Sequence, residues 1–434
     1  MRSSPPSADQ RGRTLVVGSL VDYAGVARAK TVPAARTDVF ATSGIGASPT
    51  WVTFSADNTV VFTDDIGVAG DLRLRIDPDD LVDIGDGLAW APADLCEQDG
   101  TASPLCPRRA LRAVAAQANE RGLETLMGTE IEFVVIDPDR GPSAGAEWAA
   151  YGMRSLTRHR AFLADLADAL TDAGLAPEQL HAEFGHDQYE VSLPPAAPIR
   201  MADAAVLART VIGLVAARHS LEVSFSPLPW VGAAANGAHL HLSLARDGHN
   251  IFHGGDGPHG LTPEGGAAIG GVLGGLRDLH GVYAGSVVSS QRLKAGSWSG
   301  ASVGWGLENR EAAVRLLAGT AGNPHGANIE LKIVDATANI YLAAAALLGS
   351  ALRGVVEGAP LPDELAADPQ QSGAATLSQD AGEVLDELAA STFAEQLFGP
   401  MVVAGLVAVR RHEVEVFCDA TAAEIAETLK MAWS

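Results

Sequence analysis

The sequence contains few cysteines and few basic residues for its length. Its 434 residues include three cysteines, Cys96, Cys106 and Cys418, and none of them form a Cys-x-x-Cys pair. This odd and widely spaced set argues against a disulfide framework and favours reduced thiols in a cytoplasmic protein. The 30 Lys and Arg residues are outnumbered by 53 Asp and Glu residues, so the net charge is -23. Because nucleic acids and anionic membranes bind basic surfaces, we expect neither as a partner.

We also expect no segment that targets the protein or anchors it in a membrane. Met1 to Arg13 is polar and has no apolar stretch, and the most apolar helix candidate, Ile340 to Val356, contains Arg353. We therefore predict no signal peptide and no transmembrane span. No Gly-x-x-x-x-Gly-Lys-Ser/Thr motif occurs, so a bound nucleotide is not held by a P-loop.

The chain is long enough, and at 47% apolar it is apolar enough, for more than one core. We predict two domains, residues 1–105 and 106–434. The first contains short apolar runs separated by Gly, Pro and Asp, which predict a small sheet: Leu15–Val17, Trp51–Phe54, Thr59–Phe62 and Leu72–Arg75. In the second domain, helical stretches alternate with strand-like segments around Glu190, Val223, His239 and Glu330. The predicted fold class is α+β, with an antiparallel-biased sheet backed by helices.

Five glutamates and one histidine occur in short strand-like segments spread over about two hundred residues of the second domain. They are Glu130, Glu132, Glu183, Glu190, His239 and Glu330. Alternation along a strand places Glu130 and Glu132 on one face, where two like charges repel each other unless a cation or a proton lies between them. Carboxylate ligands with a single imidazole suit Mg²⁺ or Mn²⁺ better than zinc or copper. The set predicts a site for hard divalent cations.

Arginines follow these carboxylates in the sequence. Arg292, Arg310 and Arg315 each offer a planar group that can bind phosphate or carboxylate through two hydrogen bonds. A cation site together with such arginines indicates phosphoryl transfer.

Several of these segments, in their order, resemble the type I glutamine synthetase family. They are Gly-x-Glu-x-Glu-Phe at 128–133, His-x-Glu at 181–183, Gln-x-Glu at 188–190, His-x-His at 239–241, Asn-Arg-x-x-x-Val-Arg at 309–315 and Glu-x-Lys at 330–332. With Asp22–Lys30 near the amino-terminal end and Arg411–Glu413 near the carboxy-terminal end, the resemblance covers nearly the whole chain. It implies a β-grasp domain followed by a catalytic domain, and a ring-shaped homo-oligomer, commonly of two stacked hexamers, whose active sites are shared between subunits.

The resemblance also implies a role for each residue. One divalent cation would be held by Glu132, Glu183 and Glu190, and the second by Glu130, His239 and Glu330. The residues implied to bind ATP are His241, Ser243, Arg310 and Arg315. The residues implied to bind the acid substrate or the phosphoryl group are Gly237, His239, Arg292, Arg310 and Lys332. Among these, Arg292 would bind the α-carboxylate of glutamate, and Lys332 replaces an arginine of the family with a single point charge.

The chain departs from the family where ammonium is bound. Glutamine synthetases use an Asp in a loop of the first domain and a Glu in a later flap. Here no acid lies between Asp38 and Asp57, and Trp298 stands at about the flap position. An indole favours an amine with apolar surface over ammonium, which must be held by charge. The alternative is that Trp298 only packs the flap. With the usual acids missing, Glu183 is the carboxylate that could take the proton of the amine.

The expected function is ATP-dependent formation of a γ-glutamyl amide from glutamate and an amine, through a γ-glutamyl phosphate. Polyamines, ethanolamine and other alkyl or aryl amines remain candidates for the acceptor. Two alternatives stay open, namely a glutamine synthetase that uses ammonia and a non-catalytic paralogue that keeps only the scaffold.

Overall fold

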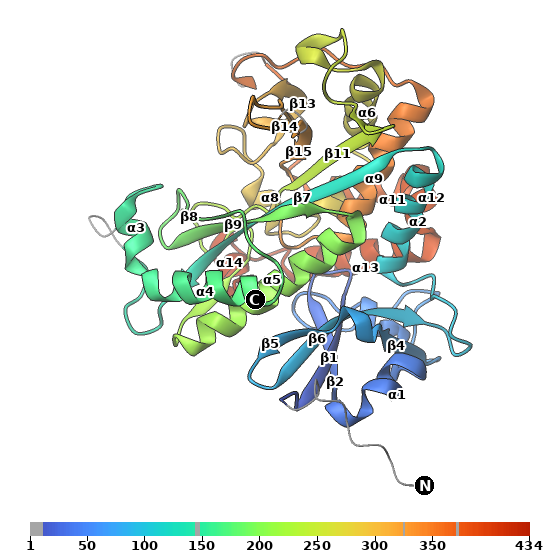
Figure 1. Cartoon of the computed structure of the whole chain (residues 1–434), viewed down its shortest axis with the longest axis vertical. Coiled ribbons are helices and arrows are strands. Elements are labelled where there is room, and N and C mark those ends of the chain that lie inside the picture. The colour runs from blue at the N-terminus through green and yellow to red at the C-terminus, as the bar shows by residue number, and fades with distance from the viewer. Residues whose placement is uncertain (1–11, 144–147, 324–325, 370–372) are drawn as a thin grey trace.

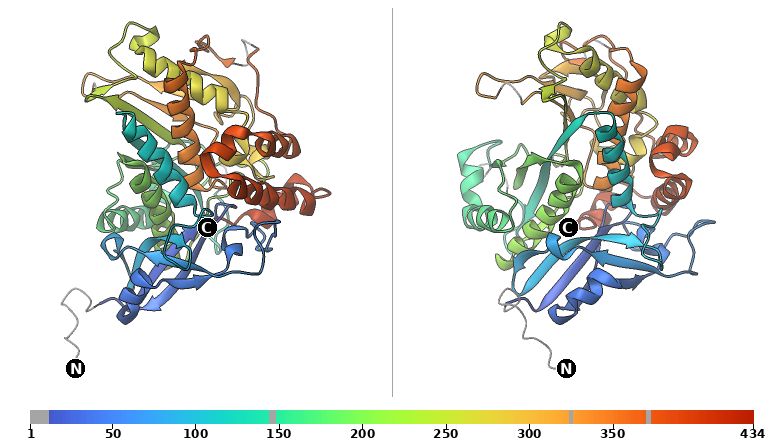
Figure 2. Two further views of the ribbon diagram at one scale, coloured as in Figure 1. Left: turned by 90° about the vertical axis from the view of Figure 1, so that its right-hand side faces the viewer. Right: turned by 45° about the vertical axis from the view of Figure 1, so that its right-hand side comes forward.

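The computed structural model describes residues 12–143, 148–323, 326–369 and 373–434, and in them the chain forms two sheets with helices around the larger one (Figure 1). The first eleven residues, which belong to the segment for which we predicted no signal peptide, lie outside the described part. The smaller sheet lies at one end of the long axis of the molecule, below the larger sheet and its helices (Figure 2). The predicted α+β class is confirmed.

The smaller sheet is six-stranded, with the order β2-β1-β6-β4-β3 and with β5 paired to β6. Its strands are β1 Leu15–Val21, β2 Ala27–Pro33, β3 Ile45–Ala47, β4 Leu72–Ile76, β5 Val82–Gly85 and β6 Leu88–Cys96. Strands β1 and β6 are parallel, and the other pairs are antiparallel. A single short helix, α1 (Thr37–Thr42), lies beside β4. This sheet agrees with the β-grasp-like domain that the resemblance implied.

Two apolar runs of this domain do not become strands of the sheet. Trp51–Phe54 instead follows Pro49 into a 3-10 helix, Pro49–Val52. The run at Thr59–Phe62 contributes only an isolated bridge between Phe54 and Val60. The turn between the two runs has its own local hydrogen bond, because Asp57 accepts from the backbone N–H of Thr59. Local turn chemistry therefore outweighs the β propensity of these residues.

The larger sheet is nine-stranded, with the order β13-β14-β15-β11-β7-β9-β8, while β10 pairs with β7 and β12 with β11. Its strands are β7 Glu124–Ile136, β8 Gln179–Ala182, β9 Gln188–Ala196, β10 Glu222–Ser224, β11 Leu240–Arg246, β12 His249–Asn250, β13 Ser302–Leu307, β14 Ala312–Leu317 and β15 Asn328–Leu331. All of its described pairs are antiparallel except β13 with β14.

Helices cover the larger sheet and form the carboxy-terminal part of the chain. The helices before residue 300 are α2 Pro107–Glu120, α3 Met153–Arg158, α4 Arg160–Asp172, α5 Pro198–Arg218, α6 Pro263–Gly275, α7 His280–Ala284 and α8 Ser289–Arg292. Those after it are α9 Ile340–Glu357, α11 Ala381–Ala390, α12 Thr392–Phe398, α13 Pro400–Val416 and α14 Ala422–Leu429. Helix α5 packs against β7, β9 and β10, and α4 packs on α5.

Helix α9 is the apolar segment for which we predicted no membrane crossing. Among the described helices it alone is, by itself, long and apolar enough for a span, and most of it is buried inside the protein. It packs against α2, α5 and α6, so it is a core helix of the larger domain. The proposed domain boundary at 105/106 falls just before α2, which begins at Pro107.

Candidate active site

Strand pairing brings the predicted glutamates together on the larger sheet. In β7, Thr129 and Ile131 are buried, and Ile131 belongs to the core. Glu130 and Glu132 alternate with them and therefore project from the opposite face. The pairing of β7 with β9 places Glu132 directly opposite Glu190. The three carboxylates thus lie on one face as a consequence of alternation and register.

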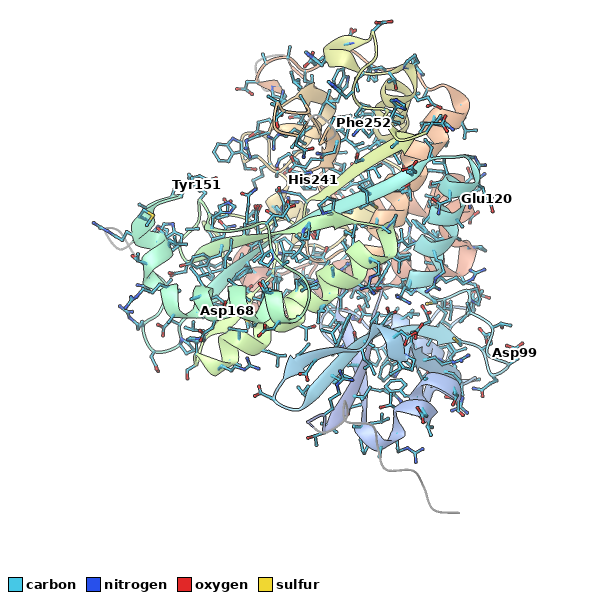
Figure 3. The ribbon with its side chains drawn as sticks, viewed as in Figure 1. Asp99, Glu120, Tyr151, Asp168, His241 and Phe252 are labelled. Carbon is cyan, nitrogen blue, oxygen red and sulfur yellow. The ribbon has the colours of Figure 1, made fainter. Side chains whose placement is uncertain are left out.

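The neighbouring strand β11 supplies the histidines. It lies between β7 and β15, and its residue His241 pairs with Glu330 of β15. His239, just before β11, is surrounded by carboxylates. Its Nδ1 lies 2.9 Å from Glu130 Oε2 and 3.3 Å from Glu330 Oε1, and its Nε2 lies 3.8 Å from Glu132 Oε1. His241 Nε2 lies 3.2 Å from the other oxygen of Glu130. In Figure 3, His241 and Tyr151 lie on one side of β7, and Asp168 of α4 lies on the other.

Three sets of side chains in the described part have ligand atoms close enough to share a metal ion. These sets are Glu130 with Glu190 and His239, Glu130 with His241 and Glu330, and His181 with Glu183 and Glu190. All six predicted metal ligands are therefore in or next to one cluster, because Glu132 contacts His239. The sets divide the ligands differently from the two predicted triads. Oxygen donors with one or two imidazoles fit Mg²⁺ or Mn²⁺.

His181 is a member of this cluster that we did not predict from the sequence. Its Nε2 lies 2.9 Å from Glu183 Oε1 and 3.8 Å from Glu190 Oε1. The signal was present in the His-x-Glu spacing, because residues two apart on strand β8 and just after it point to the same side. Only Glu183 of that motif was predicted to be a metal ligand.

The carboxylates divide into two electrostatic classes. Burial and the neighbouring Glu130, Glu132 and Glu183 raise the pKa of Glu190 to about 10. Burial also raises the pKa of Glu132 above its usual value. For Glu130, hydrogen bonds with His239 and His241 outweigh burial and hold its pKa well below the usual range. Without a cation, the crowded side of the cluster therefore holds a proton where a metal ion would supply positive charge.

The predicted cationic residues lie at different depths. Arg292 is 3% exposed, and its two terminal nitrogens donate to the backbone carbonyls of Ile333 and Lys332. Lys332 Nζ lies 3.2 Å from Glu330 Oε1, so its charge compensates a proposed metal ligand. Arg315 lies between Glu308 and Glu330. Arg310 is exposed in the turn between β13 and β14, and its charge acts on the phenol of Tyr151.

Gly237 lies where the cluster meets Arg292. A Cβ atom at this position would be 2.4 Å from His239 Nε2 and 3.1 Å from a terminal nitrogen of Arg292. Its backbone N–H also donates to Glu132 Oε2 at 2.9 Å. The residue must therefore be glycine for the backbone to approach both groups. Ser243, two residues beyond His241, lies farther along β11 and donates to the carbonyl of Ala327.

Three exposed aromatic residues surround the Glu183 side of the cluster. Phe184 follows Glu183 directly, and its ring lies 6.2 Å from that of Trp298, in an edge-to-face arrangement. The backbone N–H of Tyr151 donates to the carbonyl of Glu183 at 3.2 Å. Burial and the Glu183 carboxylate raise the pKa of Tyr151 to about 12, so its phenol stays neutral. The sequence had indicated only Trp298 as a residue of this region.

Comparison with known proteins shows the family of the chain. Residues 104–428 match the model of the glutamine synthetase catalytic domain. The chain belongs to the glutamine synthetase family. It is similar to the gamma-glutamylpolyamine synthetase GlnA3 of Streptomyces coelicolor, at 40% identity over 92% of this chain and 89% of that protein. It is 30% identical to the glutamine synthetase of Pyrococcus horikoshii over 80% of both chains.

The fold comparison agrees. A crystal structure of a glutamine synthase homolog superimposes with a TM-score of 0.86, at 31% identity and with 98% of both chains covered. The family resemblance stated from the sequence is confirmed, and so is the enzyme class: the chain is an ATP-dependent carbon–nitrogen ligase of the glutamine synthetase family. Its members use ATP, divalent metal ions and small-molecule substrates. The individual roles of the site residues remain predictions.

Proposed function

We propose that this enzyme joins the side-chain carboxylate of glutamate to an aliphatic amine, with a polyamine as the favoured acceptor. The proposal is carried by one observation. The exposed rings of Phe184 and Trp298 lie next to each other on the Glu183 side of the site, where the amine is expected to bind. The similarity to a gamma-glutamylpolyamine synthetase, at 40% identity over nearly the whole chain, supports the same acceptor.

The reaction needs two steps because a carboxylate has no workable leaving group. In the first step, a carboxylate oxygen of glutamate attacks the γ-phosphorus of ATP, ADP leaves, and a γ-glutamyl phosphate forms. In the second step, the amine nitrogen attacks the acyl carbon, inorganic phosphate leaves with the bonding electron pair, and the amine loses a proton. The products are the γ-glutamyl amide, ADP and phosphate.

The residues of this chain are assigned as follows. Glu130, Glu132, Glu183, Glu190, His239 and Glu330 hold two divalent cations, Mg²⁺ or Mn²⁺, which when bound neutralise the oxygens of ATP and the transferring phosphoryl group. Arg310 and Arg315 bind the phosphates, and His241 and Ser243 lie on the nucleotide side. Arg292 binds the α-carboxylate of glutamate with the guanidinium donors that its backbone contacts leave free.

Glu183 is proposed to accept the proton of the attacking amine. Its oxygens lie beside His181 and the backbone N–H of Phe184, which orient the carboxylate. Addition of the amine to the acyl carbon makes the nitrogen cationic and the acyl oxygen anionic, and phosphate leaves as the carbonyl forms again. A carboxylate on the Glu183 side therefore stabilises the nitrogen as it becomes cationic.

The test is release of phosphate from ATP with Mg²⁺ and glutamate, using ammonium, ethanolamine, butylamine, 1,4-diaminobutane and spermidine in turn. We expect kcat/KM for the best amine to exceed that for ammonium by at least about tenfold, since ammonium has no apolar surface for the rings to bind. Ammonium as the best substrate would instead support a glutamine synthetase, as in the Pyrococcus relative. No release with any acceptor would favour a non-catalytic paralogue.

The assembly remains part of the proposal. The family resemblance implies a ring of identical subunits, commonly two stacked hexamers, with the boundary at 105/106 separating the part that reaches a neighbouring subunit from the catalytic part. The mass of the purified protein in solution tests this directly.

A further inference from the structure

Two of the largest exposed apolar side chains lie next to each other at the active site. Phe184 is 59% exposed and Trp298 is 50% exposed. Their rings are 6.2 Å apart, with an angle of 72° between the planes, so they form one continuous apolar wall. Phe184 comes from the segment between β8 and β9, and Trp298 from the flap between α8 and β13. Adjacent exposed rings on a chain of net charge -23 indicate a binding surface.

The flap is held in a defined conformation that presents Trp298. Glu311 accepts two backbone hydrogen bonds, one from Gly296 N at 3.0 Å and one from Trp298 N at 2.8 Å. The same turn is closed by Ser299 Oγ, which accepts from the backbone N–H of Lys294 and donates to its carbonyl. Trp298 itself has a positive φ of 56°, which is costly for a large side chain. The two bonds to Glu311 offset that cost and fix the direction of the indole.

The wall starts at the proposed proton acceptor. The backbone N–H of Phe184 donates to Glu183 Oε2 at 3.1 Å, so the Glu183 carboxylate is held against the backbone of the residue that carries the first ring of the wall. Tyr151 approaches from the opposite segment, with its backbone N–H on the carbonyl of Glu183. An amine nitrogen at Glu183 would therefore have its carbon substituent directed along the two rings.

We propose that Phe184 and Trp298 bind the carbon chain of an aliphatic amine whose nitrogen lies at Glu183, and that Glu311 is a positioning residue that holds Trp298 against Phe184. This inference rests on the proposed function and assigns the part of the site that selects the acceptor. The rings contribute apolar contact to the methylene groups and attract positive charge through their faces. Ammonium has no methylene groups for the rings to contact, so we expect the wall to contribute little to its binding.

The experiment compares ammonium with butylamine in the full-length enzyme, with saturating ATP, Mg²⁺ and glutamate. For Phe184→Ala and Trp298→Ala, we expect KM for butylamine to rise about tenfold, the range of one lost ring contact. We expect KM for ammonium to change much less than KM for butylamine, because ammonium has no carbon chain for the rings to contact. Trp298→Phe should recover most of the loss, because it keeps a ring.

Variants of Glu311 are tested by the same comparison of KM for butylamine with KM for ammonium. Glu311→Ala removes both acceptors of the flap and should raise KM for butylamine about as much as Trp298→Ala. Glu311→Gln keeps one carbonyl oxygen and should give an intermediate value. The double variant of Glu311→Ala and Trp298→Ala should be no worse than Trp298→Ala alone, because the carboxylate acts through the indole. Val356→Ala, a half-exposed apolar residue of α9, is the control for loss of surface area.

The outcomes separate the two proposals. If the wild-type enzyme uses only ammonium, the proposed function and the wall are both wrong. If it uses butylamine but the ring variants keep the wild-type KM for butylamine, or raise KM for ammonium equally, only the wall is overturned. For a variant that loses its folded signal in circular dichroism, Phe184→Leu and Trp298→Phe provide the same comparison with the apolar volume largely retained.

Discussion

The metal-ligand cluster and the aromatic wall lie side by side but are built in different ways. Glu130, Glu132, Glu190 and Glu330 stand on paired strands, and each is fixed by register and by contacts with other members of the cluster. Phe184 and Trp298 stand on loops, are half exposed, and touch each other across the site. Under the proposed function, the strands hold the groups assigned to the activation of glutamate, and the loops hold those assigned to the acceptor.

The difference has a physical reason. Phosphoryl transfer needs charges held within fractions of an ångström, which a sheet provides because its hydrogen bonds fix every side chain along a strand. Selection of an acceptor needs only a surface of suitable shape and apolarity, which loops can change without disturbing the sheet. Substitutions in the two regions should therefore differ in both the size and the kind of their effects.

The largest effect is expected in the cluster. Glu130→Gln keeps the shape of the side chain but removes the charge that His239 and His241 contact. We expect phosphate release to fall about 10³-fold with every acceptor, as on loss of an electrostatic group in an active site. The measurement is phosphate release with ammonium and with butylamine. Glu120→Gln on the exposed part of α2 is the control, and a loss confined to one acceptor would contradict the assignment.

A smaller effect is expected at the junction of the two regions. Glu183→Gln should lower kcat with amines about 100-fold, since a proton acceptor of this kind contributes on that order. Binding of Mg²⁺ and ATP, followed by calorimetry, should persist through the remaining ligands. Retention of most amine-dependent turnover in a variant that still binds the metal ion would show that another group takes the proton.

Metal binding should depend on pH because of the crowded carboxylates. The pKa of Glu190 is raised to about 10 by burial and neighbouring carboxylates, so the metal-free cluster holds a proton at neutral pH. Since a ligand must be deprotonated, Mg²⁺ displaces that proton, and affinity rises as pH rises. We expect about a tenfold gain per pH unit between pH 6 and 8, measured by titration calorimetry in two buffers of different ionisation enthalpy. A pH-independent affinity would show that the ion does not use Glu190.

In the metal-free protein, Glu190 makes the free energy of unfolding fall as pH rises, whereas the affinity for Mg²⁺ increases. A folded-state pKa raised above the unfolded value stabilises the protein fully at low pH, and this contribution is lost as pH rises toward 10. Added Mg²⁺ should therefore raise the melting temperature more at pH 8 than at pH 6. Thermal unfolding with and without Mg²⁺ provides an independent measurement of the proton linkage.

The smallest effect is expected from Tyr151→Phe. The substitution removes a neutral hydroxyl near Glu183 but keeps the ring and the backbone contact with the Glu183 carbonyl. We expect KM for butylamine to change by about fivefold or less, the size of one hydrogen bond. Steady-state kinetics with butylamine and ammonium measure it. A loss as large as that of Glu183→Gln would assign a chemical role to the phenol.

Much of the cluster could be predicted from the sequence, because its ligands occur in short motifs with period-two spacing. Glu130 and Glu132 share a face wherever their strand lies, so the sequence alone indicated like charges that need a cation. The order of the motifs also indicated the family, and the apolar run Ile340–Val356 was correctly expected to be a helix. The strand prediction for Trp51–Phe54 was wrong because Trp51 and Val52 belong to a 3-10 helix that begins at Pro49, and Phe54 forms only an isolated bridge.

The rest depended on contacts between segments distant in the sequence. The sequence by itself determined the ligand types, the arginines, the absence of the flap acid and the presence of Trp298. Only the tertiary structure decided that Phe184 meets Trp298 and that Glu311 holds the flap, because loops at 184, 298 and 311 have no periodic pattern that fixes their neighbours. In a strand, the position of a residue in the sequence determines the face on which its side chain lies. The distance between two loops depends instead on how the strands and helices that connect them pack together.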